Sequence, residues 1–101
     1  MNRIKSTNIE GAPVVGVTGT YYPDLKDIRL EIALDTAEGW SEQELPLVVV
    51  DGSPDDKVAG ALRARGAIVL AAKLPGIASQ RQQGTLYVLG QGGDKIITHE
   101  P

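Results

Sequence analysis

The sequence contains no cysteine, and this absence removes several kinds of chemistry at once. Without thiols the chain forms no disulfides, no thiolate metal site and no cysteine nucleophile. A chain without thiols is also consistent with a reducing compartment.

An excess of basic charge is missing too. The ten Lys and Arg residues are outnumbered by thirteen Asp and Glu residues, which gives a net charge of -3. The basic residues are also scattered along the chain, so the sequence predicts no positive surface that would hold a phosphate backbone. We therefore expect no nucleic acid among its partners.

Long apolar runs are likewise absent. The longest, residues 45–50, is far shorter than the about 20 residues that a transmembrane helix needs. Residues 1–10 are polar and lack the apolar core of a secretory signal. These features predict a cytoplasmic protein without a membrane span.

The remaining composition is that of an ordinary globular protein. Of the 101 residues, 42% are hydrophobic and 23% are charged, which fits one folded domain rather than a disordered or fibrous chain. We expect a single domain over residues 1–101, with residues 1–11 as a loose arm.

Short β-type runs alternate with helical patterns along the chain. Strands are expected at residues 14–18, 47–50, 67–70 and 95–98. Helices are expected at residues 24–38, between Pro23 and Gly39, then from a Ser53 cap to Gly66, and at residues 77–89. Leu25, Ile28 and Ile32 have helical spacing in the first helix, and Val58 and Leu62 in the second. The order β-α-β-α-β-α-β predicts an α/β fold with an open, mostly parallel sheet and helices on both faces.

Polar residues follow the strands, where open parallel sheets bind their ligands. Thr20, Tyr21 and Tyr22 offer hydroxyl groups and aromatic faces after the first strand. Asp51 and Ser53 follow the second, where a carboxylate accepts hydrogen bonds from a ribose or a base. Taken singly, an Asp-Gly-Ser segment is more often a turn with a helix cap.

Arg81 lies in the third helix and can contact phosphate through its guanidinium, although a lone Arg on a helix is usually a solvated charge. Gly84, in the middle of the same helix, predicts close packing or close approach of a ligand. Trp40 is expected as a hydrophobic plug after the first helix rather than as a sugar-stacking platform.

Three segments in order resemble motifs of the GT-A glycosyltransferases of the family 2 type. Gly19-Thr20-Tyr21-Tyr22 resembles Pro-Thr-Tyr-Asn, with Thr20 and Tyr21 matching. Val50-Asp51-Gly52-Ser53-Pro54-Asp55 resembles Asp-Asp-Gly-Ser-Thr-Asp, with Val50 in place of the first Asp. Residues 76–84 resemble a third motif, which reads Gly, three or four residues, Ala-Arg-Asn, one residue and Gly. Arg81 and Gly84 match its Arg and its second Gly.

The resemblance covers residues 14–101 and implies the nucleotide-binding half of such an enzyme, with sheet order 3-2-1-4. It implies that Asp51 and the loop of Thr20, Tyr21 and Tyr22 hold the nucleoside of a nucleotide diphosphate sugar, and that Ser53 also belongs to the nucleotide-binding site. Arg81 would face the diphosphate.

The resemblance also implies a divalent metal, Mg or Mn, in the complete enzyme. Glu100 stands where the first carboxylate of the family's Asp-x-Asp element is expected, and the sequence ends one residue later. We therefore expect a truncated domain with no metal of its own and no activity alone. The alternative is a non-catalytic α/β interaction or structural module. A small redox domain is disfavoured, because no Gly-x-Gly-x-x-Gly follows the first strand.

The predicted strand order leaves the strand at residues 95–98 at an edge of the sheet. Ile96 and Ile97 are β-branched, and an unpaired ladder of amides and carbonyls is a template for another chain. The sequence therefore predicts self-association, either as a homodimer through the fourth strand or as slow aggregation if the register is loosely specified.

Overall fold

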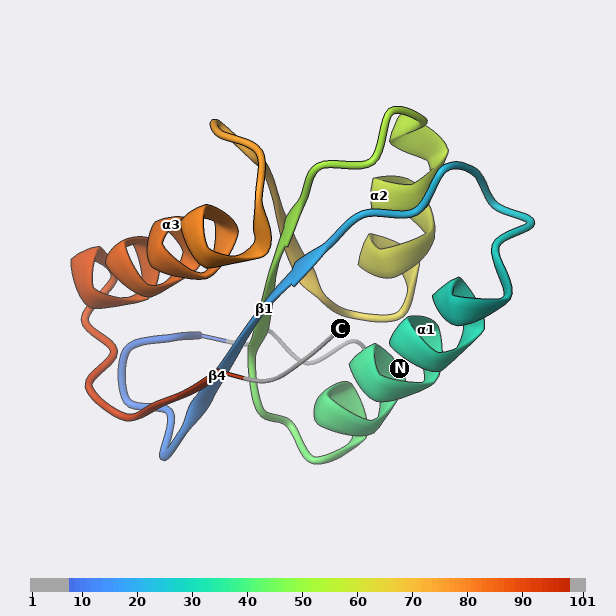
Figure 1. Cartoon of the computed structure of the whole chain (residues 1–101). Helices are drawn as coiled ribbons and strands as arrows, with labels where there is room; N and C mark the ends of the chain where they lie inside the picture. The colour runs from blue at the N-terminus through green and yellow to red at the C-terminus, as the bar shows by residue number, and fades with distance from the viewer. Residues whose placement is uncertain (1–7, 99–101) are drawn as a thin grey trace.

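The computed structural model describes residues 8–98, in which four strands alternate with three helices (Figure 1). In chain order these elements are β1 (Val15–Thr20), α1 (Ile28–Glu42), β2 (Leu47–Asp51), α2 (Asp56–Ala64), β3 (Ile68–Ala71), α3 (Ile77–Gly90) and β4 (Ile96–Thr98). The predicted order of elements is therefore confirmed.

The four strands form one parallel sheet in the order β3-β2-β1-β4, as predicted. In the register of β1 with β2, Thr20 pairs with Asp51, so the two central strands end level with each other. The chain runs from β1 outward to β3 and then crosses to β4 on the other side of β1. The direction of winding therefore reverses beside β1, which is the place where such sheets bind ligands.

Helices cover both faces of the sheet, with α1 and α2 on one face and α3 alone on the other (Figure 1). Leu30 of α1 and Leu62 of α2 pack with Val49 of β2 in one apolar cluster. Val88 of α3 packs with Val17 of β1 in the cluster on the opposite face. The strands are buried on both faces, which explains their continuous apolar sequences.

The first strand extends two residues beyond its predicted end and includes Gly19 and Thr20. The pairing of Thr20 with Asp51 and a hydrogen bond from the Gly52 N–H to the Thr20 carbonyl (2.9 Å) continue the ladder to that point. Thr20, which was expected in the loop, therefore belongs to the strand.

The first helix begins and ends later than residues 24–38. Asp27 is its N-cap, with a side chain that accepts a hydrogen bond from the Arg29 N–H, so the cap rather than Pro23 fixes the start. Gly39 lies inside the helix and does not end it, and the left-handed backbone at Glu44 (φ 59°) follows the true end. The buried residues of α1 are Leu30, Ala33 and Ala37.

The apolar residues that gave the helical pattern lie on the outside of that helix or before it. Ile28 is 79% exposed, Ile32 is 65% exposed, and Leu25 precedes the helix and is 47% exposed. Their spacing predicted a helix at this place, but the helix packs on the sheet through a different stripe.

The second helix confirms the expected buried pair, because Val58 and Leu62 are fully buried. The expected cap is wrong: Asp55, not Ser53, is the N-cap and accepts a hydrogen bond from the Lys57 N–H (2.9 Å). Ser53 is engaged in hydrogen bonds elsewhere.

Two glycines permit close contacts between helices and the sheet. A Cβ atom at Gly84 would lie 2.6 Å from Cγ1 of Val17, so this residue allows α3 to approach β1, as predicted. A Cβ atom at Gly16 would lie 2.7 Å from the ring of Trp40. Trp40, which was expected after the first helix, lies inside the last turn of α1. It packs against the core and so has the packing role that the sequence predicted.

Within the part of the chain that the structure describes, none of the helices combines the length and apolar character needed to cross a membrane.

Candidate functional site

Asp51 lies at the carboxyl end of β2 and organises the polar residues around it. Its Oδ1 atom accepts a hydrogen bond from the Thr20 hydroxyl (2.8 Å) and another from the Ser53 hydroxyl (2.6 Å). Thr20 is 1% exposed and Asp51 is 8% exposed, so the Thr20–Asp51 bond lies out of solvent. Three of the predicted nucleotide-binding residues are therefore joined in one network.

The same network fixes the chain after β1. The Ser53 hydroxyl accepts a hydrogen bond from the Tyr22 N–H (2.8 Å), which ties the segment after β1 to the segment after β2. The Tyr22 side chain is buried and packs against the cluster that contains Leu30. Tyr21, by contrast, is 56% exposed. Of the two predicted tyrosines, only Tyr21 thus offers a largely open ring.

A buried glutamine secures the same edge of the sheet from the other face. Gln80 of α3 donates hydrogen bonds from Nε2 to the carbonyls of Thr20 (2.9 Å) and Val50 (2.8 Å). A Cβ atom at Gly19 would lie 2.8 Å from the Gln80 Cβ, so the glycine makes room for this side chain. The ends of β1 and β2 are therefore held at a fixed separation.

A cleft of about 390 Å³ opens next to this network. It is lined by Tyr21 and Tyr22 after β1, Arg29 and Ile32 of α1, and Ile77 at the start of α3. Since α1 and α3 lie on opposite faces, the cleft crosses the end of the sheet near β1. This is the place where the winding of the sheet reverses.

Arg29 brings a guanidinium group to the cleft, where it is paired with a carboxylate. Its Nε donates to Oδ1 of Asp27 (3.0 Å), and Nη2 forms an ion pair with Oδ2 of the same carboxylate. Its guanidinium carbon lies 5.6 Å from the centre of the Tyr22 ring, within the range of a cation–π contact. The cleft thus combines a cation with an exposed aromatic ring.

These contacts shift the pKa values of the groups around the cleft. Hydrogen bonds from the Arg29 side chain and N–H lower the pKa of Asp27 to about 2. Burial raises the pKa of Tyr22 above its ordinary value, although the Arg29 charge acts in the opposite direction. Asp27 is therefore ionised and Tyr22 neutral at physiological pH.

Arg81 lies one helical turn after Ile77, on the same flank of α3 as this cleft residue. Its Nε atom is shielded from solvent, and the residue has an interaction elsewhere in the molecule. Arg81 is thus close in sequence to the cleft residue Ile77, but Arg81 itself does not line the cleft.

The predicted metal ligand Glu100 lies outside the described residues. Within residues 8–98, no group of three His, Asp or Glu side chains is placed to hold a metal ion. These residues alone do not form the metal site that the resemblance implies, and no chemical step is assigned to a metal here.

The sequence analysis missed Arg29 and Gln80. The helix was expected to start just after Pro23, so Asp27 was not identified as its N-cap. With Asp27 as the cap, Arg29 would have been placed in the first turn of the helix. Gln80 has no comparable signal, because its role depends on how closely α3 approaches Gly19.

Comparisons of the chain with protein-family models, with curated proteins and with solved structures found no match. The cleft and the network beside it are therefore the features of the structure on which a function can be proposed.

Proposed function

We propose that this chain binds a nucleotide diphosphate sugar in the cleft beside β1, as the nucleotide-binding half of a GT-A glycosyltransferase does. The observation that carries the proposal is the position of this cleft. It lies at the reversal point of a parallel sheet and is lined by an exposed tyrosine and an arginine next to the Asp51 network.

Each part of the ligand has a matching group. The base would stack on the open Tyr21 ring, which is exposed in the lining of the cleft. Asp51 lies beside the cleft rather than in its lining, and Thr20 and Ser53 both donate to its Oδ1, so a ribose hydroxyl at the edge of the cleft would donate to Oδ2. Arg29 lines the cleft and would contact the diphosphate, while it also pairs with Asp27. Arg81 does not line the cleft and would have to turn toward it to make the second contact that the resemblance implies.

Sugar transfer by this chain alone is not part of the proposal. Transfer needs a base that takes the acceptor proton, and the resemblance also implies a metal bound through Glu100. The described residues supply no group of three metal-binding side chains. We therefore expect purified residues 1–101 to bind the donor without transferring its sugar.

A second function, a non-catalytic interaction module, is favoured by the same hydrogen bonds. Thr20, Asp51 and Ser53 bond one another, and this arrangement would also hold the loops together without any ligand. The two functions differ in whether Tyr21 and Arg29 respond to a nucleotide.

We also propose a homodimer and a cytoplasmic location. The dimer would form through β4, where Ile97 is 51% exposed at the edge of the sheet. The location rests on the thiol-free composition.

The test of nucleotide binding is a titration of the chain with uridine diphosphate and with guanosine diphosphate, followed by amide NMR. We expect one of them to shift the resonances of Tyr21, Arg29 and Ile77. Arg29→Met should weaken its binding about 3- to 10-fold, because a charge-assisted contact in an open site is lost.

Arg65→Met is the matched control, since Arg65 pairs with Glu38 on the exposed surface and does not line the cleft. Equal affinities of the two variants would contradict the site. The absence of any specific shift with either nucleotide would favour the interaction module.

A further inference from the structure

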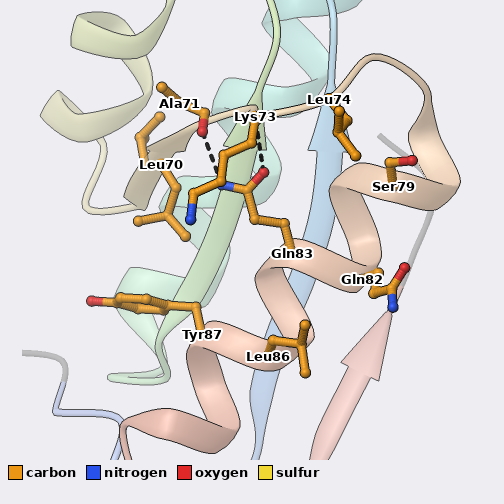
Figure 2. A pocket seen from close by; sticks show the side chains of 10 residues that line it. Leu70, Ala71, Lys73, Leu74, Ser79, Gln82, Gln83, Leu86 and Tyr87 are labelled. Carbon is orange, nitrogen blue, oxygen red and sulfur yellow. Dashed lines mark hydrogen bonds between the residues drawn. The ribbon is translucent and has the colours of Figure 1, made fainter.

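A second and larger cavity, of about 710 Å³, lies between the outer edge of β3 and α3 (Figure 2). The residues that line it come from β3, from the segment after it and from one flank of α3: Val69, Leu70, Ala71, Lys73, Leu74, Ser79, Gln82, Gln83, Leu86 and Tyr87. Its volume is within the range of about 300–1,000 Å³ that is usual for small-molecule sites. Among the described residues it shares no lining residue with the cleft beside β1.

The walls of the cavity are mainly apolar. Leu70 and Tyr87 are partly buried and belong to the cluster under α3. Leu74 is 64% exposed and Leu86 is 60% exposed, so two large apolar side chains of the lining face water. An apolar ligand body that covered them would be stabilised by the hydrophobic effect.

The lining of the cavity also includes one positively charged side chain. Lys73 is the single charged residue among the described residues that line the cavity. Its side chain extends past the Gln83 amide toward Leu70 (Figure 2), and within residues 8–98 it forms no ion pair with a carboxylate. The charge of the cavity therefore complements an anionic group.

Side chains occupy backbone groups at the outer edge of β3, so another strand cannot simply add there. This observation helps to decide between a peptide and a small molecule as the ligand of the cavity. Gln83 donates from Nε2 to the Ala71 carbonyl (2.9 Å) and accepts at Oε1 from the Lys73 N–H (2.9 Å), as Figure 2 shows. Arg63 donates to the Val69 carbonyl (3.1 Å) on the same strand. An extended peptide would have to displace these side chains, so the geometry disfavours strand addition and favours a small molecule.

We propose that this cavity binds a small amphipathic anion, in which a carboxylate pairs with Lys73 and an apolar body covers Leu70, Leu86 and Tyr87. This site is independent of the nucleotide cleft, and a chain that failed to bind nucleotides would still bind this ligand.

The test uses decanoate as the probe and decanol as its uncharged counterpart, each titrated into the intact chain and followed by methyl NMR. We expect decanoate to shift the methyl resonances of Leu70, Leu74 and Leu86. Lys73→Met, which keeps an apolar side chain without the charge, should weaken decanoate binding about 10-fold and leave decanol binding within about twofold.

Lys57→Met is the matched control, because Lys57 is exposed on α2 and its loss changes the net charge equally. Leu86→Glu, at an exposed position of α3, should abolish decanoate binding while the chain stays folded. The proposal is overturned if Lys73→Met and Lys57→Met bind decanoate equally, or if decanoate shifts no methyl of this cavity.

Binding of a peptide in place of a small molecule would give a different experimental result. If an extended apolar decapeptide bound more tightly than decanoate and protected the Ala71 amide from hydrogen exchange, strand addition at β3 would replace the small-molecule site.

Discussion

Asp51 has a structural role that its position after a strand does not reveal. Its Oδ1 atom is the acceptor for two hydroxyl groups, one of them on the buried Thr20. A substitution at this residue therefore changes the free energy of unfolding as well as any ligand contact. The proposed ligand contact through Oδ2 has to be separated from that structural role.

Asp51→Ala should destabilise the fold, because the Thr20 and Ser53 hydroxyls lose their common acceptor. We expect a loss of about 1–3 kcal/mol in the free energy of unfolding, measured by urea denaturation. Asp51→Asn keeps an acceptor oxygen and should lose less. Asp35→Ala, at an 84% exposed carboxylate, is the control and should change stability by no more than about 0.5 kcal/mol. An Asp51→Ala variant as stable as this control would show that the network contributes little.

Asp27 gives the second test at a single residue. Its pKa of about 2 lies below the ordinary value of 3.8, so its contribution to stability is complete above about pH 4 and is lost as the pH falls through 2. The carboxyl carbon-13 resonance of Asp27 should titrate near pH 2, and in Arg29→Met the midpoint should rise toward 3.8. A wild-type midpoint near 3.8 would mean that the pair with Arg29 does not persist in solution.

At the scale of elements, the sequence predicted the order and approximate extent of every strand and helix in residues 8–98. Apolar runs separated by Gly, Pro or Asp are local features of the sequence, and they were sufficient to predict the order of these elements. The helix caps were harder, because Ser53 and Asp55 are both good N-caps and only the bonds of Ser53 to Asp51 and Tyr22 decide between them. The buried stripe of α1 was harder still, since Ile28 and Ile32 are more apolar than the alanines that face the core.

Two helical glycines should respond to alanine in opposite directions. Gly39 lies in α1 with open space around its Cβ position, so Gly39→Ala should stabilise the chain by about 0.5–1 kcal/mol through helix propensity alone. Gly84→Ala should destabilise it, because the new methyl would lie 2.6 Å from Cγ1 of Val17. Thermal unfolding of both variants checks this, and stabilisation by Gly84→Ala would mean that α3 lies farther from β1 than described.

At the scale of the whole molecule, the two edge strands of the sheet, β3 and β4, differ in how side chains cover them. Side chains of Arg63 and Gln83 bond to the backbone of β3 and of Lys73 beyond it, whereas Ile97 of β4 is half exposed. An edge strand with an exposed β-branched side chain is a site for pairing with another chain. The strand order needed for this inference was predicted, but the protection of β3 by Gln83 depends on tertiary contacts that sequence spacing does not specify.

The β4 edge should therefore mediate self-association. We expect the wild-type mass in light scattering to rise with concentration toward that of a dimer, and Ile97→Lys to remain monomeric. Ile28→Lys is the control, because Ile28 is 79% exposed on α1 and should not affect pairing of β4. A wild type that stays monomeric at high concentration would show that β4 is not a docking edge.

The most direct test of the central claim is a measurement of nuclear Overhauser effects between a bound nucleotide diphosphate and the protein. We predict contacts from the base protons to the Tyr21 ring and to the methyl groups of Ile32 or Ile77, which together line the cleft beside β1. Contacts to Leu70 and Tyr87 instead would place the nucleotide in the cavity beside β3 and contradict the account. The absence of any intermolecular contact at saturating nucleotide would contradict it as well.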